Sequence, residues 1–169
     1  MDAKTKHLVK KAVAGDKTAY GDLYALYALD MYRFALSICK HPQDAEDAVQ
    51  ETALSVYKSI GTLKNKDKFK SYLFMALSNT CKKKMGKEKP KAEFFENTKA
   101  DASQSDFLFT YEIKEALFKL DETPRKILVL SIIVGFTSKE IGEMLDMPAA
   151  TVRTKQKRAL EFMRKELQK

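Results

Sequence analysis

The sequence predicts an all-α protein: two small helical domains joined by a flexible linker, the C-terminal one a helix-turn-helix. The chain of 169 residues has no tryptophan and only six glycines and four prolines, which leaves few turn residues for a β-protein. Long segments carry apolar residues at helical spacing. From about Gly86 to Asp106 this periodicity is lost, and Lys, Ser, Asn and acidic residues dominate, as in a linker.

The first domain, residues 1–86, is expected to hold four helices, each with an apolar stripe. Gly15-Asp16 ends the first helix and His41-Pro42 separates the second from the third. A lysine-rich loop at Gly61–Lys68 precedes the fourth. The helices are expected at about 8–14, 18–39, 42–59 and 69–84, and the third is expected to bury Ala45, Val49, Ala53, Val56 and Ile60.

The outer face of the third predicted helix mixes acidic and apolar residues. An exposed leucine set among carboxylates indicates a partner surface, although isolated exposed leucines are also common. The residues on this face are Asp44, Asp47, Gln50, Glu51 and Leu54.

The linker, residues 87–109, is rich in charge but also contains aromatic residues, which either pack on a domain or enter a partner. The second domain, residues 110–169, begins with helices expected at 111–120 and 124–134. Thr123 is the expected cap of the latter, and Gly135 its C-terminal stop. The apolar residues in or beside the linker are Phe94, Phe95, Phe107, Leu108 and Phe109.

The last thirty-odd residues have the pattern of a helix-turn-helix. Thr137 and Glu140 have capping-box spacing, and Asp146-Met147-Pro148 breaks the first helix of the pair. The second helix is expected to bury Val152, Ala159, Leu160, Met163 and Leu167. Its other side carries small polar and basic residues, as insertion into the major groove requires. These are Ala150, Thr151, Thr154, Lys157 and Arg158, flanked by Arg153 and Lys155.

Charge is segregated along the chain. The net charge is +8, yet residues 64–91 alone hold ten lysines against Asp67 and Glu88, and residues 151–169 hold seven basic residues against Glu161 and Glu166. The rest of the chain is therefore net acidic. Two separate basic patches indicate a polyanion bound at two places and a different partner at the acidic patch.

Several classes of function are disfavoured. Cys39 and Cys81 are expected to be buried free thiols, as in a reducing cytoplasm. His7 and His41 are isolated, so neither indicates a metal site. No phosphate loop, paired catalytic carboxylates or nucleophile triad is present, which argues against an enzyme and against a cofactor. No signal peptide or membrane span is seen, and no membrane insertion is expected.

The order of these features resembles the small, two-domain extracytoplasmic-function group of bacterial RNA polymerase sigma factors. The segment Asp44–Glu51 resembles the polymerase-docking signature of that group, and Gly15-Asp16 with Ala19, Leu23 and Tyr27 resembles its opening helices. Further matches are Phe69-Lys70-Ser71-Tyr72-Leu73, where the family has Phe-x-x-Trp-Leu, then Asn79-Thr80, and Ala150-Thr151-Val152-Arg153-Thr154 for Gly-Thr-Val-(Lys/Arg)-Ser.

The resemblance implies a promoter-specificity subunit that binds core RNA polymerase through the β′ clamp helices and the β flap, with promoter DNA and an anti-sigma factor as further partners. The acidic face would dock on the clamp helices. The first domain would hold the melted minus-ten element, and the last helix would read the minus-thirty-five duplex. The residues implied for minus-ten contacts are Lys66, Lys68, Phe69, Tyr72, Asn79, Thr80, Lys83 and Lys84.

Three positions depart from the family pattern. Tyr72 replaces a tryptophan, Lys82–Lys84 replace a more Arg-rich segment, and Gln156 stands where an apolar residue is common. Lysine keeps the attraction to phosphates but reads bases less well than arginine. Two other functions remain open: a stand-alone helix-turn-helix regulator that binds duplex DNA unaided, and a helical interaction protein with no DNA dependence.

Overall fold

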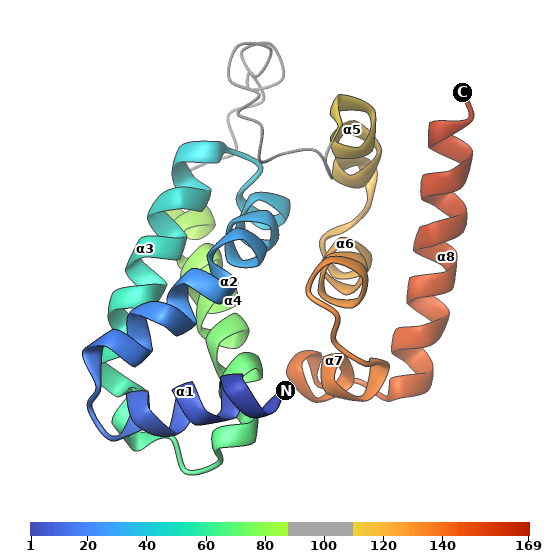
Figure 1. Cartoon of the computed structure of the whole chain (residues 1–169). Helices are drawn as coiled ribbons and strands as arrows, with labels where there is room; N and C mark the ends of the chain where they lie inside the picture. Colours follow the sequence, from blue (N-terminus) through green and yellow to red (C-terminus); the bar gives the residue numbers. More distant parts are fainter. Residues whose placement is uncertain (88–109) are drawn as a thin grey trace. The chain divides into compact units, whose positions relative to one another are not determined.

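The computed structural model describes residues 1–87 and 110–169, and its contacts divide the chain into two compact units, Met1–Lys84 and Met85–Lys169. Within the described residues there are eight α-helices and no strand (Figure 1). The all-α class is therefore confirmed. The linker residues 88–109, with Phe94, Phe95, Phe107, Leu108 and Phe109, lie outside the described residues.

Aspartate caps begin the first two helices. Helix α1, Ala3–Val13, follows Asp2, whose carboxylate accepts the Thr5 N–H at 2.7 Å. Helix α2, Lys17–Cys39, follows Asp16, which accepts the Ala19 N–H at 3.0 Å. These caps satisfy amide donors that a helix start leaves unpaired. The Asp2 cap explains why α1 begins five residues earlier than its apolar stripe indicated.

Helix α3, Pro42–Ser59, and helix α4, Phe69–Lys87, complete the first unit. The loop between them contains two 3-10 turns, Ile60–Thr62 and Lys66–Lys68. Ala45, Val49, Val56 and Ile60 are buried as predicted, while Ala53 is half-buried. Phe34, Phe69 and Phe74 are among the largest fully buried side chains, and Cys39 and Cys81 are buried free thiols, as predicted.

The second unit contains helices α5, Tyr111–Lys119, and α6, Glu122–Leu128, followed by a π-helical turn, Val129–Ile133. The expected cap at Thr123 is wrong. The helix already begins at Glu122, because Pro124 needs no N–H partner in a first turn and so permits an earlier start. Gly135, with φ of +83°, ends the segment as predicted, and the Phe136 N–H donates to the Leu130 carbonyl at 2.9 Å.

The helix-turn-helix consists of α7, Ser138–Leu145, and α8, Ala149–Leu167. Val152 and Ala159 are buried, but Leu160 and Leu167 are exposed, contrary to the prediction. The buried face of α8 is therefore narrower than the row of apolar residues that the sequence places along the helix. Leu160 is turned about 100° from Ala159 around the helix, which places it on the flank of that face.

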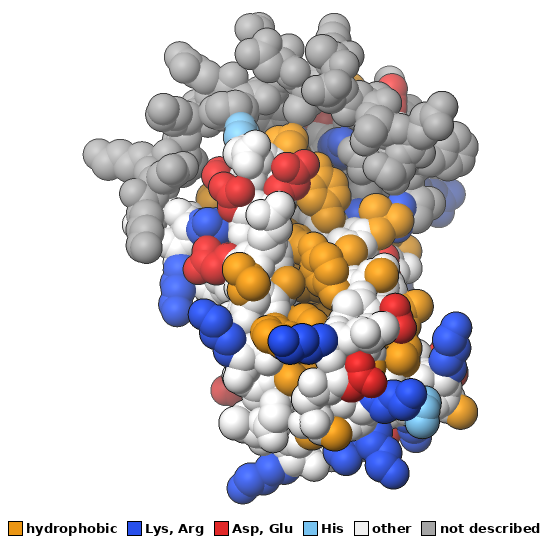
Figure 2. All heavy atoms as spheres, turned by 60° about the vertical axis from the view of Figure 1, so that its left-hand side comes forward, with side chains coloured by type: hydrophobic (Ala, Val, Ile, Leu, Met, Phe, Trp, Pro, Cys, Tyr) orange, Lys and Arg blue, Asp and Glu red, His pale blue; other side chains and the backbone are white. Residues whose placement is uncertain are grey.

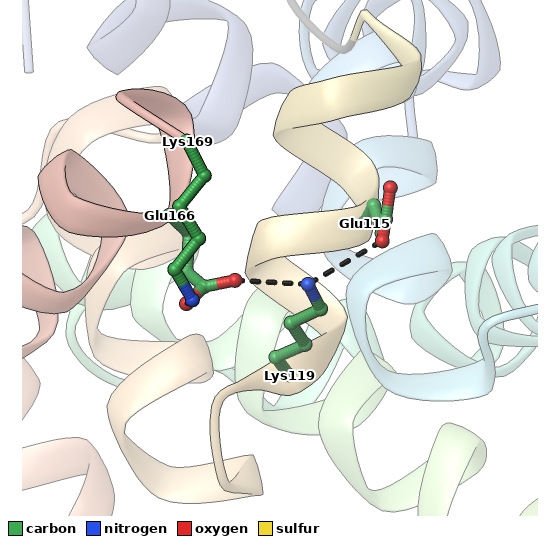
Figure 3. A network of polar contacts seen from close by, with 4 residues as sticks. All are labelled: Glu115, Lys119, Glu166 and Lys169. Carbon is green, nitrogen blue, oxygen red and sulfur yellow. Dashed lines mark hydrogen bonds and ion pairs between the residues drawn. The ribbon is translucent and has the colours of Figure 1, made fainter.

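An ion network joins α5 to the end of α8 (Figure 3). The Lys119 ammonium lies 2.8 Å from a Glu166 carboxylate oxygen and 3.3 Å from one of Glu115, and Lys169 also pairs with Glu166. Hydrogen bonds from Lys119 and Lys169 lower the pKa of Glu166, and that carboxylate in turn raises the pKa of Lys119. The network ties the two helices together where α8 has little apolar burial.

Candidate nucleic-acid and partner interfaces

The outer face of α3 carries the predicted acidic surface. Asp47, Gln50, Glu51 and Leu54 are all exposed, and Leu54 has 63% of its surface exposed, a large value for leucine. Asp44 differs, because it is half-buried in the first turn, where its N–H lies 3.4 Å from the His41 Nδ1 that caps the helix. Exposed carboxylates beside an exposed leucine combine long-range steering with area that can be desolvated on binding.

Apolar side chains are also exposed near this face. Figure 2 shows them gathered as a band down the first unit, with acidic side chains beside its upper part. A contiguous apolar band rimmed by charge is typical of a protein-binding surface. The large exposed apolar residues of the first unit, Met1 aside, are Leu26, Leu29, Leu54, Tyr57 and Met75.

One residue predicted for DNA contacts the acidic face instead. The Lys84 ammonium lies 3.2 Å from a Glu51 carboxylate oxygen. Burial by itself would lower the pKa of Lys84, but the hydrogen bond and charge of Glu51, with the charges of Asp47 and Asp44, outweigh it and raise the pKa. Lys84 therefore neutralises part of the α3 surface in the isolated chain.

Two more contacts join α3 to α4. The hydroxyl of Thr52, which is fully buried, donates to Thr80 Oγ1 at 3.0 Å, and Thr80 donates in turn to the Ala76 carbonyl. The Tyr72 hydroxyl hydrogen-bonds with the Ser59 hydroxyl. The side-chain hydroxyls of Thr80 and Tyr72 therefore form hydrogen bonds with α3. The sequence did not indicate these contacts.

Phe69 differs from the prediction as well. It is 1% exposed, and its ring centroid lies 6.1 Å from that of Tyr27. A buried ring held by an aromatic neighbour belongs to the core and cannot stack on a base without unfolding the start of α4. Phe69 is therefore not part of the DNA-binding surface proposed below.

A basic and polar surface remains on the outside of α4 and on the loop before it. Asn79 and Lys83 are exposed, and Met75, 43% exposed, lies one turn before Asn79 on the same face. In the loop, Lys66 and Lys68 are exposed. Met75 was not foreseen, because an apolar residue inside an apolar helix gives no sequence signal of exposure.

The geometry of the helix-turn-helix depends on its turn. The predicted capping box is present: Thr137 Oγ1 accepts the Glu140 N–H at 3.2 Å, and Glu140 accepts the Thr137 N–H at 2.7 Å. Asp146 adopts a left-handed conformation with φ of +53°. A Cβ on Gly142 would lie 2.5 Å from the Met147 carbonyl oxygen. Only glycine therefore allows the turn to close on α7, a constraint that no residue pattern in the sequence indicates.

The outer face of α8 is presented to solvent. Ala150, Arg153, Thr154, Lys157 and Arg158 are exposed, while Thr151 and Lys155 are half-buried. The Thr154 hydroxyl donates to the Ala150 carbonyl at 3.0 Å, which leaves its oxygen able to accept a hydrogen bond. Small residues flanked by arginine and lysine on a helix supported by α7 are suited to reading base edges and holding phosphates.

Two family models match the chain. Residues 23–90 match the model for sigma-70 region 2, and residues 110–163 match the model for sigma-70 region 4. The chain is 30% identical over 142 residues to the RNA polymerase sigma factor SigV of Bacillus subtilis (strain 168), covering 83% of this chain and 86% of SigV. It is 25% identical to the ECF RNA polymerase sigma factor SigW of the same organism, covering 99% and 98%.

The chain belongs to the extracytoplasmic-function group of the sigma-70 family. This sigma factor is a promoter-specificity subunit for RNA polymerase. Solved structures share its fold. CnrH, in complex with the cytosolic domain of CnrY, has a TM-score of 0.75 at 21% identity, covering 98% of this chain and 97% of that one. The sigma factor RpoE with the anti-sigma factor NepR from Bartonella quintana has a TM-score of 0.72 at 22% identity, covering 87% and 97%.

No helix among residues 1–87 and 110–169 is both long and apolar enough to cross a membrane. In the same ranges, no group of three or more His, Cys, Asp or Glu side chains is placed to hold a metal ion.

Proposed function

We propose that this sigma factor docks on core RNA polymerase through the outer face of α3. The observation that carries the proposal is the exposure of Asp47, Glu51 and Leu54 on one face of the helix. The expected counterpart is the pair of β′ clamp helices, with the β flap as a contact for the second unit. Opposite charges steer the encounter, and Leu54 supplies desolvated area once the surfaces meet. Asp44 and Gln50 extend the surface along α3.

The proposed minus-ten surface consists of the loop before α4 and the outer face of that helix. Extruding a base costs a few kcal/mol, which pocket contacts and phosphate attraction must offset. Asn79 can read the edge of an unstacked base, while Lys66, Lys68 and Lys83 hold phosphates. Tyr72 supports the surface from its edge. Thr80 and Lys84 are proposed instead as contacts between α3 and α4.

The proposed minus-thirty-five surface is the outer face of α8. Ala150, Thr151 and Thr154 lie near base edges, and Arg153 can form a bidentate pair with guanine. Lys155, Lys157 and Arg158 mainly hold phosphates. The domain assignment follows: residues 1–86 for docking and the minus-ten element, 110–169 for the minus-thirty-five element, and 87–109 as their linker.

We also propose an anti-sigma factor as a partner, supported by the RpoE–NepR complex. The chain is proposed to be a non-catalytic subunit with no cofactor. Its proposed partners, core polymerase and promoter DNA, place its action in the cytoplasm.

The decisive experiment is run-off transcription with purified core RNA polymerase and a library of candidate promoters. We expect a small set of related promoters to be transcribed only when this chain is added. Failure of the chain to direct transcription, together with sequence-specific duplex binding by the free chain at paired half-sites, would favour a stand-alone regulator instead.

Promoter opening is tested on the promoters recovered. Exchanging the loop Gly61–Lys68 is expected to change which minus-ten sequence is transcribed without changing core binding. Asn79→Ala and Lys83→Ala are expected to slow opening on closed duplex, measured by permanganate reactivity of promoter thymines, and to matter much less on a template already mismatched there. Normal opening by both variants would remove α4 from the proposed surface.

A further inference from the structure

Helix α1 is a strongly basic element. Between Ala3 and Val13 it holds four lysines and no acidic residue. Thr5, Val9 and Ala12 are buried, whereas every one of the lysines is exposed. The match to sigma-70 region 2 begins at residue 23, so α1 lies outside the segment by which the family model defines that region.

Contacts place α1 beside the proposed minus-ten loop. It packs against both 3-10 turns of the loop, and the Lys6 ammonium lies 3.3 Å from an Asp67 carboxylate oxygen. Lys10 follows Lys6 by one helical turn and therefore shares its flank. An exposed ion pair contributes little stability, about 0–1 kcal/mol. The burial of Val9 and Ala12 therefore holds α1 in place. The ion pair shows which flank of α1 faces the loop.

The lysines on the loop-facing flank of α1 and those of the loop together form what we call the α1–loop shelf. Figure 2 shows Lys and Arg side chains gathered at the lower end of the first unit, where Figure 1 places α1. The Asp2 carboxylate is engaged by the Thr5 N–H, and the resulting hydrogen bonds lower the pKa of Asp2. The shelf comprises Lys6, Lys10, Lys64, Lys66 and Lys68, with Asp2 and Asp67 as its acids.

We propose that the α1–loop shelf binds the phosphates of the unpaired promoter strand next to the minus-ten element, so that the strand continues from the loop onto α1. The inference rests on the proposed function and deepens it. Lysine ammonium groups hold phosphates as point charges without reading bases. An eleven-residue helix is about 16 Å long, enough to follow more than one nucleotide. The contact is therefore independent of sequence and sensitive to salt.

The test measures binding of the holoenzyme to forked DNA with a single-stranded extension and no minus-thirty-five element, taken from a promoter recovered by run-off transcription. Lys6→Gln/Lys10→Gln removes two exposed charges from the flank of α1 that faces the loop. Lys139→Gln/Lys165→Gln, two exposed charges in the second unit, is the matched control. We expect the α1 variant to flatten the dependence of log binding constant on log salt by about 0.7 per lysine, hence about 1.4, and the control to match wild type.

The length of the extension supplies a second criterion. The difference between the α1 variant and wild type is expected to vanish when the single strand is trimmed back to the minus-ten element. An unchanged salt dependence on the long extension overturns the inference. So does an equal loss on blunt duplex, since the shelf would then attract any DNA.

A photo-crosslinking residue at His7 gives a readout that does not depend on affinity. Crosslinks to the unpaired strand support the inference, and crosslinks to a polymerase subunit overturn it in favour of an acidic protein surface. If the wild-type holoenzyme transcribes normally and the α1 variant behaves like the control, this inference is refuted and the proposed function is not. If wild-type chain directs no promoter-specific transcription, the proposed function itself is refuted.

Discussion

The basic helices α4, in the first unit, and α8, in the second, differ in how their polar side chains are engaged. On α4, Tyr72, Thr80 and Lys84 contact Ser59, Thr52 and Glu51 of α3. On α8, which is also basic, Arg153, Lys157 and Arg158 have no ion pair within the described residues.

This difference indicates two kinds of interface. A surface whose side chains are held by a neighbouring helix is preorganised, but it cannot change without affecting that helix. Changes to the α4 side chains that contact α3 are therefore expected to affect polymerase docking. Changes on α8 are expected to affect DNA binding alone. The four predictions below test this contrast, from the largest expected effect to the smallest.

The largest effect is expected from Asp47→Lys/Glu51→Lys on α3. Like charges placed against each other in an interface cost several kcal/mol, so binding to core polymerase should be lost in a pull-down. Both side chains are exposed, and the circular dichroism spectrum should be unchanged. The matched control, Asp22→Lys/Glu161→Lys, reverses two exposed acids outside α3 and should bind core normally. Normal binding by the α3 variant would remove this face from the docking site.

Gly142→Ala should damage the second unit and spare the first. The added Cβ meets backbone atoms of Met147 that cannot move aside cheaply, and overpacking of this kind costs about 1–3 kcal/mol. Urea unfolding should show the loss. Core binding through α3 should persist while minus-thirty-five binding weakens.

Gly21→Ala is the control for that substitution. Gly21 lies inside α2 with no atom within 4 Å of an added Cβ, so alanine should stabilise the chain by about 0.5–1 kcal/mol through helix propensity. Equal effects of the two substitutions would show that the turn after α7 does not require glycine.

Arg153→Ala and Lys157→Ala separate base reading from phosphate binding on α8. Arg153→Ala should lose about 1–3 kcal/mol of discrimination between a consensus and a scrambled minus-thirty-five duplex. Lys157→Ala should weaken both duplexes alike and lower the salt slope by about one. Neither should change core binding. Sequence-independent losses from both would make α8 a phosphate clamp.

The smallest effect is expected from Lys84→Gln, and it should appear in the association with core polymerase only. Removing the partner of Glu51 exposes more negative charge on α3, so association with core should speed up by less than about fivefold, since an exposed ion pair contributes about 0–1 kcal/mol. Opening of a minus-ten element should not improve. The matched control, Lys83→Gln, should leave the core association rate unchanged. Equal rates for both variants would deny the coupling between α3 and α4.

Much of the fold and of the candidate surfaces could be predicted, because these features depend on residues that are close together in the sequence. The helix-turn-helix was predictable because Thr137 and Glu140 cap a helix, and Pro148 ends one, through interactions with residues only a few positions away in the sequence. The acidic face of α3 was predictable because side chains three and four residues apart share a face. Thr123 failed as a cap because two competing starts, Glu122 and Pro124, lie within one turn.

The amino-acid sequence by itself determined the helices of this sigma factor, the separation of its acidic and basic surfaces and the family to which it belongs. These features depend on the spacing of residues and the order of charges along the chain. Only the tertiary structure decided that Phe69 is core, that Lys84 pairs with Glu51 and that α1 adjoins the loop. Each of these depends on which helices pack together. Periodicity shows that a face is buried, but the partner across that face is fixed by the packing of the whole unit.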